Sequence, residues 1–158
     1  MKILLVSDTH GNNAALDKLA KLHPNMDMYL HAGDSESTEW SIYPFSSVLG
    51  NCDYYADFPE HMELTIPGGK LWMQHRPYID IEKLKRHNVR LFLYGHTHRR
   101  DYHVIDGITF INPGSIAFAR DDYYYSYAII TINEKEIDVI FKQLDEEDYE
   151  QKGILITY

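Results

Sequence analysis

The sequence opens with Lys2-Ile3-Leu4-Leu5-Val6-Ser7-Asp8-Thr9-His10, an apolar run that ends in an aspartate and a histidine. A continuous apolar run without polar alternation is typical of a strand buried on both faces, as in a parallel sheet. Asp8 and His10 are two residues apart, so both side chains lie on the same side of an extended chain. The sequence therefore predicts two polar side chains side by side at the carboxyl end of a central strand.

The same pattern recurs three times further along the chain. Apolar runs at Met28–Ala32, Ser46–Leu49 and Leu91–Tyr94 are followed by Gly33-Asp34, Gly50-Asn51-Cys52-Asp53 and Gly95-His96-Thr97-His98. Carboxylate, amide and imidazole groups of this kind bind divalent transition metals such as Mn, Fe, Co, Ni and Zn. His75, which follows an expected strand at Lys70–Gln74, adds another imidazole.

These side chains suffice for two metal ions about 3.5–4 Å apart, with a bridging hydroxide that attacks phosphorus in line. The candidate metal ligands are Asp8, His10, Asp34, Asn51, His75, His96 and His98. Asp34 is placed as the bridging ligand because a carboxylate has two oxygens. A small phosphoester is the substrate class that this chemistry favours.

Each cluster on its own has an ordinary structural explanation. Asp8 could form a turn, His10 could lie beside a helix cap, and Asn51 could close an Asx turn. Asp53 is expected to be a structural turn residue. Cys52 is expected to be a small, half-buried side chain rather than a nucleophile, because no activating partner is visible. The metal interpretation therefore depends on all the clusters occurring together.

Composition limits the class of protein. The 158 residues, 44% of them hydrophobic, fit one domain spanning 1–158. No apolar run approaches the ~20 residues that cross a bilayer, so no membrane partner is expected. A single cysteine, Cys52, excludes an internal disulfide framework and fits a reducing, cytoplasmic location. The net charge of −9 argues against binding a nucleic-acid backbone. Bound cations would still allow a small anionic substrate.

The remaining pattern indicates the fold class. Helices are expected at Ala14–Leu22, with Asn12 and Asn13 near its start, and at Ile79–His87. Hairpins are expected around Pro67-Gly68-Gly69, Asp106-Gly107 and Asn133-Glu134-Lys135. An acidic break at 145–150 precedes a short final strand at Ile154–Tyr158. Strands and helices alternate early and hairpins dominate later, which favours an α/β fold of two stacked sheets with helices outside.

In this order and spacing, the motifs resemble those of the calcineurin-like metallophosphoesterase superfamily. The chain is similar in particular to the small bacterial and archaeal phosphodiesterase branch, which includes the eukaryotic retromer subunit. The resemblance runs from Lys2 to about Arg120 and includes Asn112-Pro113-Gly114-Ser115. It implies a four-layer α/β/β/α sandwich of two mixed sheets flanked by helices, with two metals at the carboxyl edge of the sheets. By position, Asp8, His10 and His98 would bind the first ion, Asn51, His75 and His96 the second, and Asp34 both.

The resemblance implies a divalent-metal-dependent phosphodiesterase, with manganese as the foremost cofactor and Ni, Fe, Co or Zn as alternatives. Asp34, Asn51 and Arg76 are the candidate catalytic residues. The alternative function is a catalytically weak, protein-binding scaffold of the same fold. Many family members place a histidine after the motif asparagine, whereas this chain has Cys52. The family usually has His-Gly after its fifth motif strand, whereas His75-Arg76-Pro77 stands here, and Arg76 could bind a substrate phosphate through its guanidinium.

An aromatic stretch near the carboxyl terminus suggests self-association. Tyr123, Tyr124, Tyr125 and Tyr127 fall on an expected strand that could form a homo-oligomer interface. The histidines outside the clusters are expected to be surface or packing residues: His23, His31, His61, His87 and His103.

Overall fold

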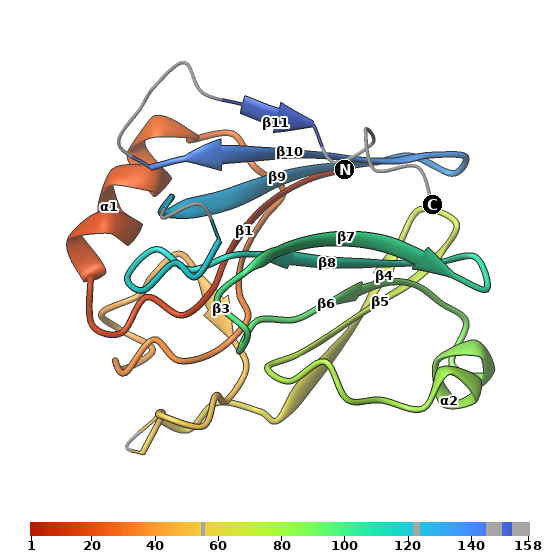
Figure 1. Ribbon diagram of the computed structural model, residues 1–158, viewed down its shortest axis with the longest axis horizontal. Helices are drawn as coiled ribbons and strands as arrows, with labels where there is room; N and C mark the ends of the chain where they lie inside the picture. Colours follow the sequence, from red (N-terminus) through yellow and green to blue (C-terminus); the bar gives the residue numbers. More distant parts are fainter. Residues whose placement is uncertain (55, 122–123, 145–149, 153–158) are drawn as a thin grey trace.

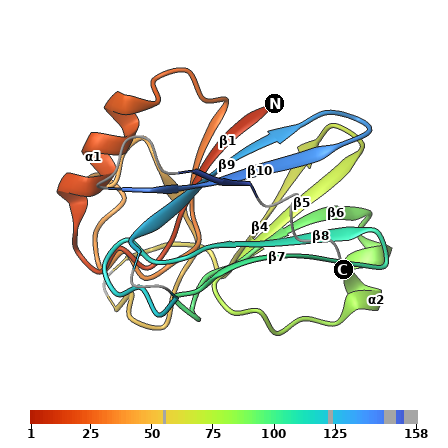
Figure 2. The same cartoon turned by 45° about the horizontal axis from the view of Figure 1, so that its top comes forward.

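Two mixed β-sheets stacked on one another form the centre of the protein (Figure 1). The structure is a computed structural model that describes residues 1–54, 56–121, 124–144 and 150–152. The strand order is β11-β10-β9-β1-β2-β3 in the first sheet and β4-β5-β6-β8-β7 in the second. Helix α1 lies outside the first sheet and α2 outside the second, which is also clear in Figure 2. The expected α/β/β/α sandwich is confirmed.

In the first sheet, parallel strands from the amino-terminal half meet antiparallel strands from the carboxyl-terminal half. Its strands are β1 (Lys2–Val6), β2 (Met28–His31), β3 (Ser46–Ser47), β9 (Ser126–Ile132), β10 (Ile137–Gln143) and β11 (Glu150–Lys152). β1, β2 and β3 run parallel, while β9 pairs antiparallel with both β1 and β10. Helix α1 (Asn13–Leu22) connects β1 to β2. A crossover connection of this kind, here through a helix, is what parallel pairing requires.

The second sheet has a parallel centre and antiparallel edges. Its strands are β4 (His61–Ile66), β5 (Gly69–Gln74), β6 (Val89–Leu93), β7 (Arg100–Ile105) and β8 (Ile108–Pro113). β5, β6 and β8 run parallel, and the expected hairpins β4–β5 and β7–β8 form the edges. Helix α2 (Ile81–Arg86) connects β5 to β6. Each sheet therefore presents a set of strands whose carboxyl ends point the same way.

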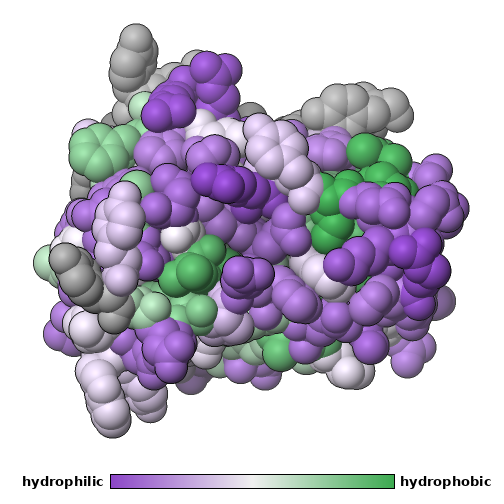
Figure 3. Space-filling model, turned by 90° about the horizontal axis from the view of Figure 1, so that it is seen from below, coloured by the Kyte–Doolittle hydropathy of each residue, from purple (hydrophilic) through white to green (hydrophobic). Residues whose placement is uncertain are grey.

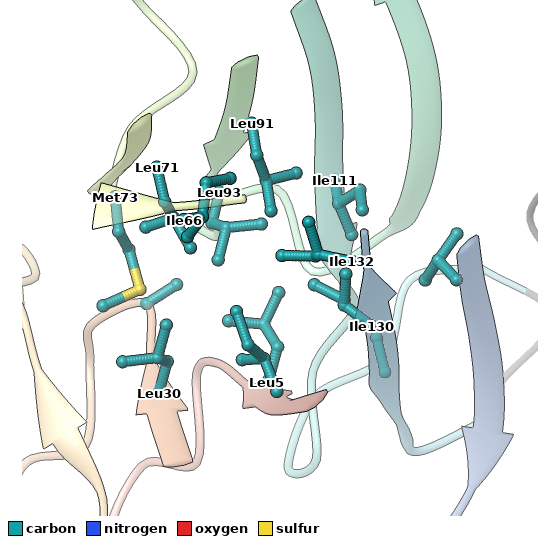
Figure 4. Close-up of a cluster of buried hydrophobic side chains, with 14 of the residues drawn as sticks. Leu5, Leu30, Ile66, Leu71, Met73, Leu91, Leu93, Ile111, Ile130 and Ile132 are labelled. Carbon is teal, nitrogen blue, oxygen red and sulfur yellow. The ribbon is translucent and has the colours of Figure 1, made fainter. Parts of the chain in front are cut away.

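The apolar run of β1 contributes to two hydrophobic layers. Ile3 and Leu5 point into the core between the sheets, where Figure 4 shows Leu5 close to side chains of the second sheet. Leu4 and Val6 belong to a separate cluster under α1. Trp72 and other side chains on the outer face of the second sheet pack against α2 in a third cluster. Burial on both faces explains why the run has no polar alternation.

Several element boundaries differ from the expected ones for identifiable reasons. α1 begins at Asn13 because the Asn12 side chain accepts a hydrogen bond from the Ala15 N–H at 3.2 Å and caps the helix. α2 begins only at Ile81, because Asp80 is the residue that caps it. β3 stops at Ser47, since the Leu49 N–H bonds to the Pro59 carbonyl instead of continuing the ladder.

The carboxyl-terminal expectations are only partly covered by the described residues. β11, at Glu150–Lys152, was not expected from the sequence and pairs with β10. The expected strand at Ile154–Tyr158 and the acidic positions 145–149 lie outside the described residues. Within the described part of the chain, no helix combines the length and apolar character that a membrane crossing needs.

Leu5 provides a test of how strongly the core between the sheets stabilises the fold. Leu5 is fully buried, so Leu5→Ala should lower the free energy of unfolding by about 2–5 kcal/mol through lost burial and a residual cavity. Urea unfolding measures this change. Leu22→Ala, at the half-exposed end of α1, is the control and should change stability by less than about 1 kcal/mol. Equal effects of the two substitutions would contradict the central position of Leu5.

Candidate metal centre

All seven expected ligands lie in loops that follow the carboxyl ends of parallel strands. Asp8 and His10 follow β1, Asp34 follows β2, Asn51 follows β3, His75 follows β5, and His96 and His98 follow β6. Carboxyl ends of parallel strands are the usual position of binding sites in α/β folds. Here both sheets contribute, so the donors converge from two layers of the sandwich.

The first group of donors consists of Asp8, His10 and His98. One nitrogen or oxygen atom from each residue lies within 4.8 Å of the other two. Oδ1 of Asp8 is 3.1 Å from Nε2 of His98, without hydrogen-bond alignment, and 3.9 Å from Nε2 of His10. Asp8 is fully buried, as are these facing side-chain atoms of Asp8 and His10.

The second group surrounds His75. Nε2 of His75 lies 2.9 Å from Oδ1 of Asn51 and 3.2 Å from Oδ2 of Asp34. The same Asn51 oxygen is 3.0 Å from Nδ1 of His96. Asp8 is common to both groups, because its Oδ1 is also 3.9 Å from Nε2 of His75. The structure thus brings all the expected ligands together, with two buried carboxylates between the imidazoles.

Two atoms of this site lack the partners that buried polar atoms normally have. Oδ1 of Asp8 and Nε2 of His10 are buried and have no hydrogen-bond partner. Leaving a buried polar atom unpaired costs about 1–3 kcal/mol, so such atoms are rare without a functional reason. A divalent cation between them would satisfy both atoms. The donor set of imidazole, carboxylate and amide oxygen therefore fits divalent transition metals.

The protonation of the site also suits cation binding. Burial alone would raise the pKa of Asp34, but hydrogen bonds from His75 and from the Cys52 N–H lower it to about 2. Contact with the Asp8 carboxylate raises the pKa of His98 despite partial burial. Burial opposes protonation of His75, yet Asp34 and Asp8 together raise its pKa. The carboxylates thus favour the protonated forms of His75 and His98, and a bound metal would replace these protons.

Backbone carbonyls orient the ligand imidazoles. Nδ1 of His75 is 2.7 Å from the Ala32 carbonyl oxygen, and Nδ1 of His98 is 2.8 Å from that of Phe118. A carbonyl can only accept, so both Nδ1 atoms carry the proton and donate it. The Nε2 atoms are then free to bind a cation in the neutral tautomer.

The ligand loops contain unusual backbone conformations. Positive φ angles occur at Asp8 (53°), His10 (44°), Asp34 (62°), Glu36 (51°), His96 (69°) and His98 (59°). For a residue with a Cβ atom such a conformation is strained, and strain of about 1–3 kcal/mol per residue is typical of functional sites. The glycines of the motifs have another role, because they let neighbouring side chains lie close to the backbone. A Cβ atom on Gly50 would overlap the Asp34 carboxylate, and one on Gly95 would overlap Ser7.

Asp53 supports the site through the backbone. Its carboxylate accepts hydrogen bonds from the N–H groups of Gly50 at 2.7 Å, Asp34 at 2.9 Å and Glu36 at 2.8 Å. These bonds connect the loops after β2 and β3. The expected role of Asp53 as a structural turn residue is confirmed.

Three further residues next to the site were not assigned a role from the sequence. Oε1 of Glu36 is 2.8 Å from Nδ1 of His10. The Ser115 hydroxyl donates to the Asp8 carbonyl at 2.8 Å, and the Asn112 amide donates to the Gly95 carbonyl at 3.0 Å. The last two belong to the Asn-Pro-Gly-Ser motif, whose position at the carboxyl end of β8 was an available signal. Glu36 lies in a loop whose sequence has no hydrophobic periodicity, so the sequence gave no signal for its role.

The two departures from the family pattern lie at the rim of the site. Cys52 is half-buried, and its Sγ accepts a hydrogen bond from the Asn51 amide at 3.3 Å. Burial and the charge of Asp34 raise the pKa of the Cys52 thiol. Arg76 is exposed, and its positive charge, after burial and His75, contributes to lowering the pKa of His96.

Comparison with known proteins agrees with this arrangement. The model of the calcineurin-like phosphoesterase superfamily domain matches residues 1–135. The chain belongs to the calcineurin-like phosphoesterase superfamily. It is 32% identical over 167 residues to the probable metallophosphoesterase YsnB of Bacillus subtilis, covering 97% of this chain and 93% of YsnB.

Solved structures of the superfamily share the fold. A conserved protein of Streptococcus pneumoniae, described as a predicted phosphoesterase, superposes with a TM-score of 0.83 at 25% identity, covering 96% of this chain and 95% of that one. An archaeal phosphodiesterase superposes with a TM-score of 0.69 at 21% identity, covering 90% of this chain and 100% of its own. The second likeness concerns the fold alone.

One fully buried histidine lies beneath the ligand loops. His31 was expected to be a surface or packing residue, and the structure places it in the interior. Its Nδ1 accepts a hydrogen bond from the Gly33 N–H at 3.0 Å, so the ring proton is on Nε2, 2.9 Å from the Thr9 hydroxyl oxygen. Complete burial lowers the pKa of His31 to about 4, although nearby carboxylates act in the opposite direction.

This histidine should make the protein sensitive to acid. Between pH 6.5 and about 4 the unfolded chain binds a proton at His31 that the folded chain does not, so stability falls as the pH falls. The loss should reach about 3 kcal/mol. Urea unfolding of metal-free protein at neutral pH and at pH 4.5 measures it. In His31→Gln, the part of the pH dependence that His31 contributes should vanish; an unchanged pH dependence would contradict the assignment.

Proposed function

We propose that this chain is a divalent-metal-dependent phosphodiesterase that hydrolyses a small phosphodiester. The observation that carries the proposal is the complete set of nitrogen and oxygen donors at one edge of the sandwich, two of whose buried atoms have no partner. We expect Asp8, His10 and His98 to hold one ion, and Asn51, His75 and His96 the other. Asp34 is proposed to contact both, as the family resemblance implies; its Oδ2 lies 3.2 Å from Nε2 of His75, and it shares a donor group with Asp8.

Two bound divalent ions would supply an activated water and neutralise charge on the phosphoryl oxygens. The chain's own contribution is to hold and orient. The carbonyl partners of His75 and His98 keep the Nε2 atoms of both rings directed at the carboxylates. Asn51, which is exposed, places a neutral amide oxygen where substrate can approach. Manganese is our first choice of metal, because hard carboxylate and amide oxygens accompany the imidazoles.

The group at the position of Cys52 affects which esters are expected to react. A leaving alkoxide needs a proton, and general acids work best with a pKa near the working pH. The Cys52 thiol has a raised pKa and is a poor acid at neutral pH. We therefore propose a preference for esters whose leaving group departs without protonation. The archaeal phosphodiesterase with this fold supports the choice of a diester.

The alternative is a protein-binding scaffold, as in the retromer subunit of the same fold. A scaffold would have no need for a complete ligand set, and this chain keeps every expected ligand. Large continuous apolar patches are typical of binding surfaces. Figure 3 shows one face of the protein on which hydrophobic side chains form small, separate areas among hydrophilic ones. The complete ligand set is the observation that favours the enzyme.

Location and self-association stay predictions. We propose a cytoplasmic protein on the basis of its single cysteine. The expected tyrosine-rich interface is reduced by the structure, since Tyr127 is buried in the cluster under α1. Tyr125 is exposed and remains a candidate contact, whereas Tyr123 lies outside the described residues.

The proposal predicts metal-dependent hydrolysis that requires Asp34. Metal-stripped protein should be inactive towards a p-nitrophenyl phosphodiester and regain activity when Mn, Ni, Zn or Mg is restored separately. Asp34→Asn removes the negative charge of the proposed bridging ligand and should lower the rate at least about 100-fold. Asp17→Asn, an exposed substitution on α1, is the control and should leave the rate unchanged. Near-native turnover of Asp34→Asn with Mn would disprove the bridging role.

A second prediction concerns Cys52, which is not expected to act as a nucleophile. Cys52→Ser should retain most activity, because a thiol with a raised pKa contributes little thiolate. Cys52→His introduces an acid with a pKa near neutrality and should raise the rate on alkyl esters by about tenfold. The ratio of rates on alkyl and p-nitrophenyl diesters measures this gain. Trapping a phosphocysteine intermediate by mass spectrometry would show that the interpretation is wrong.

A further inference from the structure

A pocket of about 430 Å³ opens beside the second group of donors. Asn51 and His75 form its wall on the side of the metal centre, and Glu60, His61, Arg76 and Lys83 line the rest together with neighbouring residues. We propose that this pocket receives the part of the substrate beyond the scissile phosphodiester and selects substrates that carry a second phosphate there. The inference rests on the proposed phosphodiesterase function, which it makes more specific.

One wall of the pocket is aromatic. Trp72 of β5 is buried, and the His61 ring stacks on it with centroids 4.3 Å apart and planes 10° from parallel. Nζ of Lys83 lies 5.3 Å from the centroid of the same indole. A cation–π contact of this kind holds the ammonium of a flexible lysine in place. Lys83 therefore presents its charge at the pocket from helix α2.

The loop that carries Arg76 is also held in position. The indole N–H of Trp72 donates to the Gln74 side-chain oxygen at 3.0 Å. The amide group of Gln74 in turn donates to the carbonyls of Arg76 at 2.8 Å and Tyr78 at 3.1 Å. These bonds connect the aromatic wall to the backbone on both sides of Pro77. Arg76 thus extends from a fixed backbone at the border between the metal centre and the pocket.

The two cations of the pocket are available for an anion. The chain has a net charge of −9, yet within the described ranges neither Arg76 nor Lys83 has a carboxylate within 4.0 Å. The neighbouring Lys85, by contrast, is paired with Glu82 at 3.5 Å and Asp106 at 3.8 Å. Glu60 also lines the pocket, so the charges of Arg76, Lys83 and Glu60 sum to one positive charge.

A terminal phosphate matches this arrangement in charge and shape. It carries about two negative charges at neutral pH and three oxygens that can bond to more than one donor. The planar guanidinium of Arg76 can donate two parallel hydrogen bonds, while the Lys83 ammonium acts as a point charge. A compact diester without this second phosphate would leave both cations unused. The negative charge of Glu60 would weaken binding both of the compact diester and of the substrate with the second phosphate.

Kinetics with a matched pair of substrates tests the proposal. The pair is p-nitrophenyl glyceryl phosphate and its analogue phosphorylated on the far glycerol hydroxyl, and the readout is the ratio of kcat/KM for the second over the first. Lys83→Met keeps the apolar stem over Trp72 but removes the charge, and should lower the ratio about tenfold. Arg76→Ala should lower it similarly, and Glu60→Gln should raise it. Lys85→Met, two residues further along α2 and paired with Glu82 and Asp106, is the matched control and should leave the ratio unchanged.

A binding experiment separates this inference from the proposed function. Calorimetry on metal-free protein compares glycerol phosphate with glycerol bisphosphate, and Lys83→Met should weaken binding of the bisphosphate about tenfold relative to Lys85→Met. If no metal restores hydrolysis but this difference is found, the proposed function fails and the pocket assignment stands. If hydrolysis occurs but Lys83→Met and Arg76→Ala alter neither the kcat/KM ratio nor bisphosphate binding, the pocket assignment is overturned.

Discussion

Each candidate ligand reaches the site because its own strand ends there. Parallel pairing of β1 with β2, of β2 with β3 and of β5 with β6 brings the carboxyl ends of the parallel strands of each sheet to one edge. The apolar core between the sheets sets the relative position of these two edges. Side chains alternate along a strand, so a register slip of one residue would exchange the faces of Ile3 and Leu4 and disrupt two hydrophobic clusters together. The geometry of the donors therefore depends on packing well away from them.

The two buried carboxylates, Asp8 and Asp34, are costly to keep charged away from water, and neighbouring hydrogen-bond donors stabilise them. Oδ2 of Asp8 accepts from the Ser7 hydroxyl at 2.6 Å and the His96 N–H at 3.1 Å. Oδ1 of Asp34 accepts from the Cys52 N–H at 2.7 Å. The outer oxygens face imidazoles instead, and these are the atoms a cation would contact. In each carboxylate, one oxygen thus binds to neighbouring groups of the fold and the other faces the candidate metal centre.

Local sequence patterns predicted most of the strands and placed the candidate ligands at the ends of those strands. Apolar runs that end in Gly-Asp or Gly-His are readable because strand burial and ligand position are both encoded within about ten residues. Features that depend on tertiary contacts were not readable. β3 is cut short by the bond from Leu49 to Pro59, and Glu36 reaches His10 only because two loops meet. The pocket brings Lys83 of α2 to the aromatic wall formed by β4 and β5, a meeting that no short segment specifies.

The left-handed backbone of the ligand loops has a consequence for the evolution of this fold. The proposed metal binding would require Asp8, His10, Asp34, His96 and His98 to keep side chains in a conformation that glycine adopts at little cost. A lineage that no longer needs catalysis would relieve this backbone strain by replacing one of the three histidines with glycine. Loss of the site therefore relieves backbone strain. Regaining it would require strained residues at several positions before the protein became active.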